Sequence, residues 1–357
     1  MKRSFLYMLV VFGLMACVIQ KPETSKEVTS VPSGDRPLAK FEPSESKVLI
    51  FIGQDNESVG GNNRFSDGYV DHIGVPAGIT HYIGLDSLDE DGHLPGLDVE
   101  ADWHAGPMSL KYYLDSPLLQ EAVVHLSIAM VGVEDKVARG EHDDVIKHIA
   151  EFLKKYPHHP YLIRIGYEFD GSWNHYEAEH FKGAWKRVVD VLKAEGVPDF
   201  ATVFGSSTPG LAYETWEAYY PGVDYVDWVG YSYFWTPPDT MKLHGLDFAR
   251  ANQHPVLMAE CAPRGKFIGQ DSAETLWSEW FGPVFEHIEK NQDVIKGFAY
   301  INCNWQSQVM WQNSSLVWGD TRVQMDSTIH ARWDAKMSLP MYINQEDDVL
   351  NLLNFAP

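Results

Sequence analysis

The amino-acid sequence predicts a (β/α)8 barrel of the TIM type, built as a single α/β domain. Eight apolar, strand-like runs follow one another along the 357-residue chain, and segments with helical periodicity separate several of them. The runs are apolar nearly throughout, as expected of parallel strands that are buried on both faces. From residue 47 onward the chain contains no short repeat, low-complexity tract or obvious linker, which favours one domain.

The eight predicted strands are bounded by turn-forming or polar residues. In chain order they are Val48–Ile52, Gly78–Ile83, Val123–Val131, Tyr161–Gly166, Phe200–Gly205, Tyr225–Tyr231, Val256–Ala259 and Gly297–Ile301. The alternative fold, an open doubly wound sheet, usually carries a Gly-rich turn after its first strand. Here the first run leads into Gly53-Gln54-Asp55-Asn56, which matches neither GxGxxG nor a P-loop, so the barrel is favoured.

Three apolar stripes at helical spacing predict helices between the strands. They lie within residues 145–153, 181–192 and 276–288. Pro157 and Gly196 follow the first two stripes, where a helix is expected to stop. The tail, residues 332–357, predicts a further helix that docks on the barrel.

The first 17 residues are typical of a bacterial lipoprotein signal peptide. A basic start, Lys2-Arg3, precedes an apolar run, Phe5–Met15, that is too short to span a bilayer. Leu14-Met15-Ala16-Cys17 resembles the lipobox, in which the cysteine is acylated. The alternative is a plain signal peptide or a short anchor, in which Cys17 has no such role.

The sequence thus predicts a signal peptide (residues 1–17), a flexible linker (18–46) and a single (β/α)8 domain (47–357). The linker is rich in Pro, Ser, Thr, Lys and Glu and has no sustained periodicity. We expect a lipid on Cys17 to hold the protein in the bacterial cell envelope, at the outer membrane or the cell surface.

Charge excludes one class of partner. The chain has 50 Asp and Glu against 28 Lys and Arg, and its formal net charge of -22 repels nucleic acid and anionic lipid headgroups.

In the predicted domain, Cys261 and Cys303 are the only cysteines, and they predict either one disulfide or two buried thiols. We expect a monomer.

The residues that follow the predicted strands indicate the function, because active sites of such barrels lie at the carboxyl ends of the strands. These positions are rich in carboxylates, amides and aromatic rings. The candidates are Gln54, Trp103, Glu168, Asp170, Trp173, Asn174, Tyr231, Tyr233, Trp235, Glu260 and Trp305. Aromatic faces stack on the apolar faces of sugars, while amides and carboxylates bond hydroxyl groups, so the mixture favours a carbohydrate over a phosphorylated substrate.

Glu168 and Glu260 each follow an apolar strand, the fourth and the seventh. Rim positions on these two strands face each other across a barrel mouth. A retaining glycosidase needs two carboxyl groups about 5 to 5.5 Å apart, one as acid/base and one as nucleophile. The alternative is an ordinary ion pair at the rim, for example between Glu168 and Arg164. The glycosidase chemistry requires no metal and no cofactor.

Two motifs strengthen this interpretation. Arg164-Ile165-Gly166-Tyr167-Glu168-Phe169-Asp170-Gly171-Ser172-Trp173 resembles the acid/base motif of glycoside hydrolase family 26, and Pro255-Val256-Leu257-Met258-Ala259-Glu260 resembles its nucleophile strand. The resemblance implies a barrel of the retaining clan, with Glu168 as acid/base and Glu260 as nucleophile. It covers about residues 160–305.

Two departures from the family pattern bear on the substrate. The mannanases of the family usually have His before the acid/base, where this chain has Tyr167, and often Asn where it has Asp170. Similar departures occur in members that act on xylan, including β-1,3-xylan. The resemblance therefore implies a β-linked polysaccharide, with mannan and xylan both open.

The clan also implies roles for neighbouring residues. A tyrosine after the sixth strand, Tyr233 or Tyr231, would contact the nucleophile, and Trp305 would form the floor of the −1 subsite. As part of the proposed mechanism, we further expect Arg164 to help hold the carboxylates and Trp173, Trp235 and Trp103 to stack on sugars. The alternatives are that the tyrosines pack between barrel and helices and that Trp305 is a core residue.

Other functions stay open. One is a surface glycan-binding lipoprotein without turnover, whose mark would be the loss of one carboxylate. Another is a hydrolase of an algal galactan, which for a sulfated galactan would need Arg264 and Lys266 to form a positive patch. A polysaccharide lyase is disfavoured, because its anionic substrate demands a basic cleft.

Overall fold

The computed structural model of the protein describes residues 37–355, apart from residues 45, 198, 313–314 and 346–347. The predicted signal peptide, Cys17 and most of the predicted linker lie outside the described residues. No helix among the described residues is both long and apolar enough to cross a membrane.

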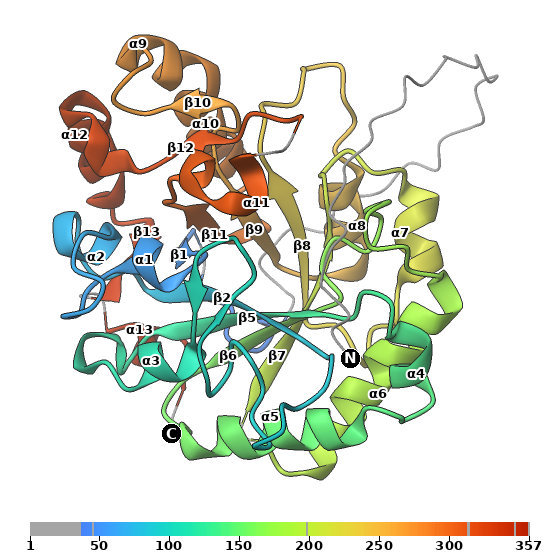
Figure 1. Ribbon diagram of the computed structural model, residues 1–357. Coiled ribbons are helices and arrows are strands. Elements are labelled where there is room, and N and C mark those ends of the chain that lie inside the picture. Colours follow the sequence, from blue (N-terminus) through green and yellow to red (C-terminus); the bar gives the residue numbers. More distant parts are fainter. Residues whose placement is uncertain (1–36, 45, 198, 313–314, 346–347, 356–357) are drawn as a thin grey trace, which may run out of the picture.

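Eight parallel strands close into a barrel, which confirms the predicted fold (Figure 1). In chain order they are β1 (Val48–Gly53), β2 (Gly78–Gly84), β5 (Val123–Ala129), β6 (Tyr161–Ile165), β7 (Phe200–Ser206), β8 (Trp228–Tyr233), β9 (Val256–Cys261) and β11 (Ile295–Ile301). Each pairs with the next in this order, and β1 pairs with β11 to close the barrel.

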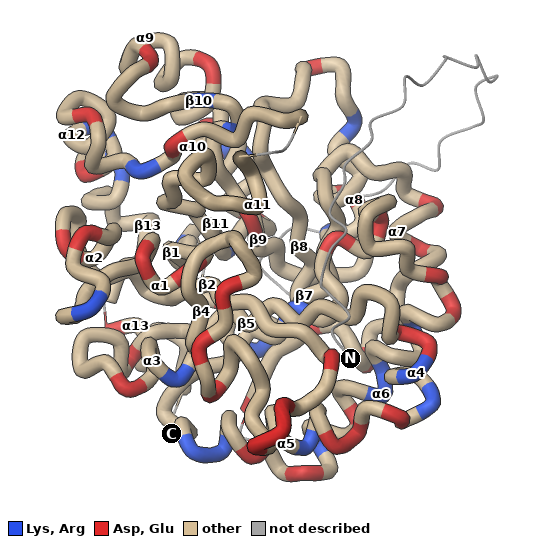
Figure 2. Tube along the Cα trace, viewed as in Figure 1, with Lys and Arg blue, Asp and Glu red and all other residues tan. Residues whose placement is uncertain are grey.

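Helices ring the barrel (Figure 1). They are α1 (Asn56–Val59), α2 (Tyr69–His72), α3 (Leu110–Leu114), α4 (Glu134–Ala138), α5 (Asp143–Lys155), α6 (Ala178–Ala194), α7 (Tyr213–Tyr219), α8 (His244–Asn252), α9 (Ala273–Leu276), α10 (Gly282–Lys290), α11 (Val309–Gln312), α12 (Ser327–Met337) and α13 (Val349–Leu352). The three predicted stripes correspond to α5, α6 and the α9–α10 segment. Acidic residues are spread over this outer layer (Figure 2).

In the described part of the chain, five short strands lie outside the ring of eight. They are β3 (Ala101–Asp102) with β4 (Pro107–Met108), β10 (Lys266–Phe267) with β12 (Gly319–Asp320), and β13 (Tyr342–Ile343), which adds to β1. The tail contains the end of α12, then β13 and the short helix α13. The predicted docking helix is present as α13, whose Val349 is buried in one cluster with the barrel residues Leu49 and Leu257.

The sixth strand begins three residues later than predicted. Residues 225–227 do not join the strand ladder but form hydrogen bonds with Thr202 of β7. The Asp227 carboxylate accepts one from the Thr202 amide, and the Tyr225 carbonyl accepts one from the Thr202 hydroxyl. The hydrogen-bonded ladder begins only at Trp228. The apolar pattern of the sequence does not reveal this start, because residues 225–227 belong to the same largely apolar run.

The amino-terminal end of the barrel is closed by both ends of the described chain. Phe41 packs edge to face on Phe355, with ring centroids 5.6 Å apart, and the Lys40 carbonyl accepts a hydrogen bond from the Trp228 indole. Phe41, Val349 and barrel side chains such as Leu49 and Leu257 share one buried cluster. The prediction of a flexible linker over residues 18–46 is thus wrong for its last part, because the side chain of Phe41 is buried there.

Cys261 and Cys303 are free and buried, so the second of the two predicted alternatives holds.

Replacing Phe41 by Ala is expected to lower the free energy of unfolding by about 3 kcal/mol, since it removes a buried ring from this closure. Leu38→Ala is the matched control: Leu38 is 50% exposed, and its loss should cost less than about 0.5 kcal/mol. Urea unfolding of both variants measures the difference. Equal losses would contradict the packing of this segment on the barrel.

Candidate active site

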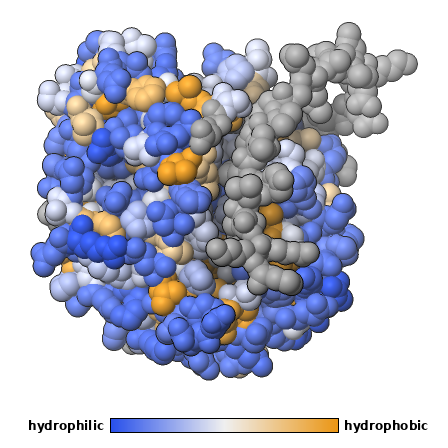
Figure 3. Space-filling model, viewed as in Figure 1, coloured by the Kyte–Doolittle hydropathy of each residue, from blue (hydrophilic) through white to orange (hydrophobic). Residues whose placement is uncertain are grey.

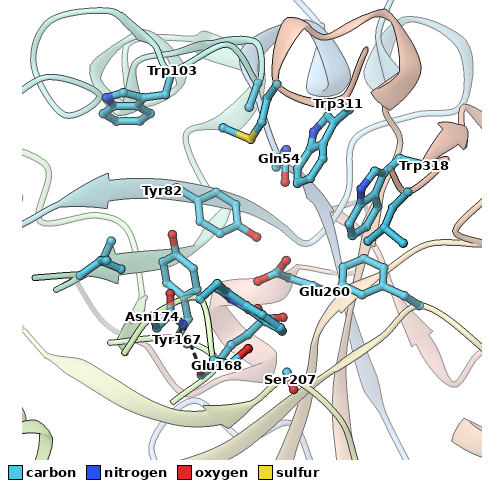
Figure 4. A pocket seen from close by; sticks show the side chains of 18 of the residues that line it. Gln54, Tyr82, Trp103, Tyr167, Glu168, Asn174, Ser207, Glu260, Trp311 and Trp318 are labelled. Atoms are coloured by element: carbon cyan, nitrogen blue, oxygen red, sulfur yellow. Dashed lines mark hydrogen bonds between the residues drawn. The ribbon is translucent and has the colours of Figure 1, made fainter. Parts of the chain in front are cut away.

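A cavity of about 990 Å³ opens at the carboxyl ends of the barrel strands. It is lined by Glu168 and Glu260 and by many aromatic side chains (Figure 4). The face of the molecule seen in Figure 3 is mostly hydrophilic, with apolar residues scattered over it. The volume suits several sugar units.

An extra residue in β9 turns Glu260 into the cavity. Ser232 of β8 pairs with Glu260 directly after Tyr231 pairs with Met258, so Ala259 is the inserted residue. The pairing with β11 shows the same shift. Without this bulge, strict alternation would send the side chain after inward-facing Ala259 to the helix layer.

Arg164 of β6 forms an ion pair with Glu260 inside the barrel. Its Nη1 donates to Glu260 Oε1 at 2.5 Å, and the Arg164 side chain is completely buried. Gly205 of β7 makes room for it, because a Cβ at this position would lie 3.0 Å from Arg164 Nε. The predicted alternative, a pair between Arg164 and Glu168, does not form.

Glu168 lies three residues beyond β6, in a tight turn where its own φ is +50°. The Asn174 side chain fixes this turn by donating to the carbonyls of Tyr167 and Glu168. The Ser232 hydroxyl donates to Glu168 Oε1 at 2.6 Å. Backbone and side chain of Glu168 are therefore both held by hydrogen bonds.

Burial raises the pKa of Glu168 to about 8, and the negative charge of Glu260 adds to this effect. The positive charge of Arg164 and the hydrogen bond from Ser232 oppose it. Glu168 thus keeps its proton at neutral pH, beside a Glu260 carboxylate that is paired with a cation. Two carboxyl groups in one cavity have environments that suit opposite roles.

The structure contradicts the prediction that Tyr231 or Tyr233 contacts the nucleophile. Both point toward the helix layer, where the Tyr231 hydroxyl bonds His287 at 2.7 Å and the Tyr233 ring stacks on the same histidine. The residue between them, Ser232, points inward because side chains alternate along a strand. The second of the two predicted alternatives, packing between barrel and helices, is the observed one.

Tyr82, near the end of β2, supplies a cavity hydroxyl; the sequence places this residue at the rim but predicts no role for it in the site. This hydroxyl points toward Glu260 (Figure 4) and has no hydrogen-bond partner among the described residues. Its ring meets Tyr167 edge to face at 5.5 Å. Its place near the end of the second predicted strand, Gly78–Ile83, is the sequence signal that points to the cavity.

Tryptophans form one wall of the cavity. Trp305 stacks on Trp318 at 4.8 Å, and Trp311 lies against both rings. Trp305 is nearly buried yet lines the cavity, so it is both a core residue and part of the wall. Trp311 and Trp318 were not predicted, because they lie after the last barrel strand, in a segment without a strong pattern.

The structure brings the other predicted residues to the same cavity. Trp103, Trp173, Trp235 and Gln54 all line it. Asp170 lines it as well, and its carboxylate also accepts hydrogen bonds from the amide and hydroxyl of Ser207. Asp170 therefore ties the turn after β6 to the end of β7.

A closed (β/α)8 barrel whose mouth combines buried carboxylates with a tryptophan wall is typical of a glycoside hydrolase. The comparison with known proteins agrees. The sequence model of glycosyl hydrolase family 26 matches residues 97–303, and the chain belongs to this family.

Among curated proteins, the chain is 30% identical to a β-1,3-xylanase from Alcaligenes sp., over 89% of this chain and 69% of the relative. It is also 30% identical to a β-1,3-xylanase from Vibrio sp., over 87% of this chain and 68% of that one. Among solved structures, an endo-β-1,4-mannanase double mutant from Cellulomonas fimi matches with a TM-score of 0.58 at 16% identity, covering 85% of this chain and 73% of the other. The chain is accordingly a glycoside hydrolase that acts on a β-linked polysaccharide.

The buried proton of Glu168 predicts a pH-dependent gain in stability for Glu168→Gln. The folded protein holds this proton up to about pH 8, whereas the unfolded chain releases it near 4.5. Wild-type stability attributable to this group is thus complete below pH 4.5 and falls as the pH rises to about 8, by at most about 1.4 kcal/mol per pH unit. The uncharged variant escapes this fall.

Urea unfolding near pH 5 and near pH 8 tests this expectation. The stability of Glu168→Gln relative to wild type should increase between the two conditions. Glu151→Gln, on the exposed side of α5, is the control and should show no such change. A constant difference for Glu168→Gln would contradict the raised pKa.

Proposed function

We propose that the protein is a retaining endo-β-xylanase that cleaves β-1,3-xylan, with Glu168 as acid/base and Glu260 as nucleophile. The observation that carries this proposal is the pairing of a protonated, buried Glu168 with an Arg164-bound Glu260 in one aromatic cavity. Such a division of protonation states is what double displacement requires before the first step.

In the first step, Glu168 gives its proton to the glycosidic oxygen as the bond to the leaving sugar breaks. Glu260 attacks the anomeric carbon and forms a covalent glycosyl-enzyme. The ion pair with Arg164 occupies Oε1 of Glu260, which leaves Oε2 for the new bond. Once Glu260 is esterified its negative charge is lost, so the pKa of Glu168 falls and its carboxylate can take a proton from water.

Water then attacks the anomeric carbon, releases the sugar with its original configuration, and restores Glu260 as a carboxylate and Glu168 as an acid. The Ser232 hydroxyl keeps the Glu168 side chain in place through both steps. The Tyr82 hydroxyl, which points toward Glu260, is suited to bond the sugar beside the nucleophile.

Support for xylan comes from sequence. The two curated relatives are named β-1,3-xylanases and align along most of this chain, whereas the mannanase structure is far less similar in sequence. Tyr167 stands in place of the histidine usual in the mannanases, and it lines the cavity. The guanidinium carbon of Arg164 lies 5.3 Å from the centroid of its ring. Mannan is the second candidate, supported by the shared family.

Product analysis on β-1,3-xylan, β-1,4-xylan, β-1,4-mannan, mixed-linkage β-glucan and algal galactans tests the proposal. We expect oligosaccharides from β-1,3-xylan, released with retained anomeric configuration by NMR. Glu168→Ala and Glu260→Ala should each lower kcat/KM by at least about a thousandfold, because each removes one reacting group.

The matched control is Glu177→Ala, an acidic residue at the start of α6 that does not line the cavity. It should retain wild-type activity. Release from mannan instead of xylan would overturn the substrate assignment, and full activity of Glu168→Ala or Glu260→Ala would overturn the mechanism. Binding of a glycan without any release would support the non-catalytic alternative.

We also propose that Cys17 carries the lipid that holds this enzyme in the bacterial cell envelope. The support is the lipobox-like Leu14-Met15-Ala16-Cys17 behind a short apolar run. In cells given radioactive palmitate, the full-length protein should incorporate label and sediment with membranes, while Cys17→Ser should do neither. Cys261→Ser is the control, and labelling of the Cys17→Ser variant would refute the proposal.

A further inference from the structure

Arg264 differs from the other described arginines. Seven of them, at positions 64, 139, 164, 187, 250, 322 and 332, each form an ion pair with a carboxylate. Arg264 forms none with any described residue, although the protein carries 50 Asp and Glu. It is a half-buried cation in the cavity wall, and burial lowers its pKa from the usual value.

Two tryptophans hold the Arg264 side chain. Its guanidinium carbon lies 5.6 Å from the ring centroid of Trp235 and 5.6 Å from that of Trp318. The backbone is fixed as well, since the Arg264 amide donates to the Phe234 carbonyl and the next amide, of Gly265, donates to the Trp318 carbonyl. A cation positioned in this way is prepared for a ligand rather than free to move.

The charged neighbours of Arg264 are engaged elsewhere. Lys266, which the sequence suggested as its partner in a positive patch, forms an ion pair with Glu279. Among the cavity carboxylates, Glu260 pairs with Arg164, Asp170 bonds Ser207, and Glu168 is protonated near neutral pH. The fourth, Asp86, also lines the cavity but forms no ion pair with Arg264. The predicted patch is therefore a single cation.

We propose that Arg264, together with Trp235 and Trp318, forms a subsite for an anionic group, a carboxylate or a sulfate, on a sugar of the bound polysaccharide. A planar guanidinium presents paired donors that match such oxyanions. The exposed part of Trp235 can stack on the sugar that carries the group, while the buried Trp318 holds the guanidinium in place. Trp235 is 40% exposed, which places this subsite at the open edge of the cavity. The inference rests on the proposed function and names a decoration that the same cavity accepts.

Binding measured without turnover tests the subsite. The background is Glu168→Gln, and the ligands are β-1,3-xylan and β-1,4-mannan, each untreated, lightly carboxymethylated or lightly sulfated. Quenching of tryptophan fluorescence reports binding, since several tryptophans line the cavity. We expect the anionic form of the bound polymer to bind about tenfold more tightly than its untreated form, and 0.5 M salt to shrink this ratio. The carboxymethylated and sulfated arms show which oxyanion is preferred.

Adding Arg264→Met should bring the ratio of anionic to neutral affinity close to one, and Arg264→Lys should restore only part of it because lysine lacks the planar fork. Lys266→Gln is the matched control and should leave the ratio unchanged. Equal affinity for the anionic and untreated forms, or an unchanged ratio in Arg264→Met, would overturn the subsite, as would binding of none of the polymers. Binding of the mannans but not the xylans would instead overturn the xylan assignment. The ratio of the affinities for anionic and untreated mannan would then test the subsite.

Discussion

The ion pair between Arg164 and Glu260 is the constraint on which the site depends. Both groups are buried, and a charge in such a place costs several kcal/mol unless a partner offsets it. The partner can reach only because Gly205 leaves space beside β6 and because the bulge at Ala259 turns Glu260 inward. Arg164 is bound to Glu260, while burial and the negative charge of Glu260 raise the pKa of Glu168, so the second carboxyl keeps its proton.

The cavity around this ion pair is built from segments that lie far apart in the sequence. The short strands β10 and β12 hold two of these segments together. β10 follows the nucleophile strand and pairs with β12, so the Trp318 segment is drawn against the loop that carries Arg264. Phe234, at the end of the sixth strand, meets Trp305 and Trp318 edge to face. Sugar rings need flat apolar partners at fixed positions, and this packing provides them without mobile side chains.

The sequence predicts those features of the fold and the site that leave a local pattern, and it does not predict those that depend on contacts between distant segments. The eight strands and the two glutamates were predictable, because burial leaves apolar runs and the chemistry sits at their ends. The inward turn of Ser232 was not, since the register of the sixth strand depends on where its ladder starts. Trp318 and the packed Phe41 depend on contacts between distant segments, which leave no periodic signal.

Charge adds a last argument about selectivity. A chain with a net charge of -22 repels an anionic polymer at long range, but salt screens that repulsion beyond about 8 to 10 Å. A neutral polysaccharide is unaffected, so the acidic surface can serve solubility at no cost to binding. Selection among decorated chains must then come from groups at contact distance. In this cavity the cation without a carboxylate among the described residues is Arg264, and its two tryptophans keep it where a sugar can meet it.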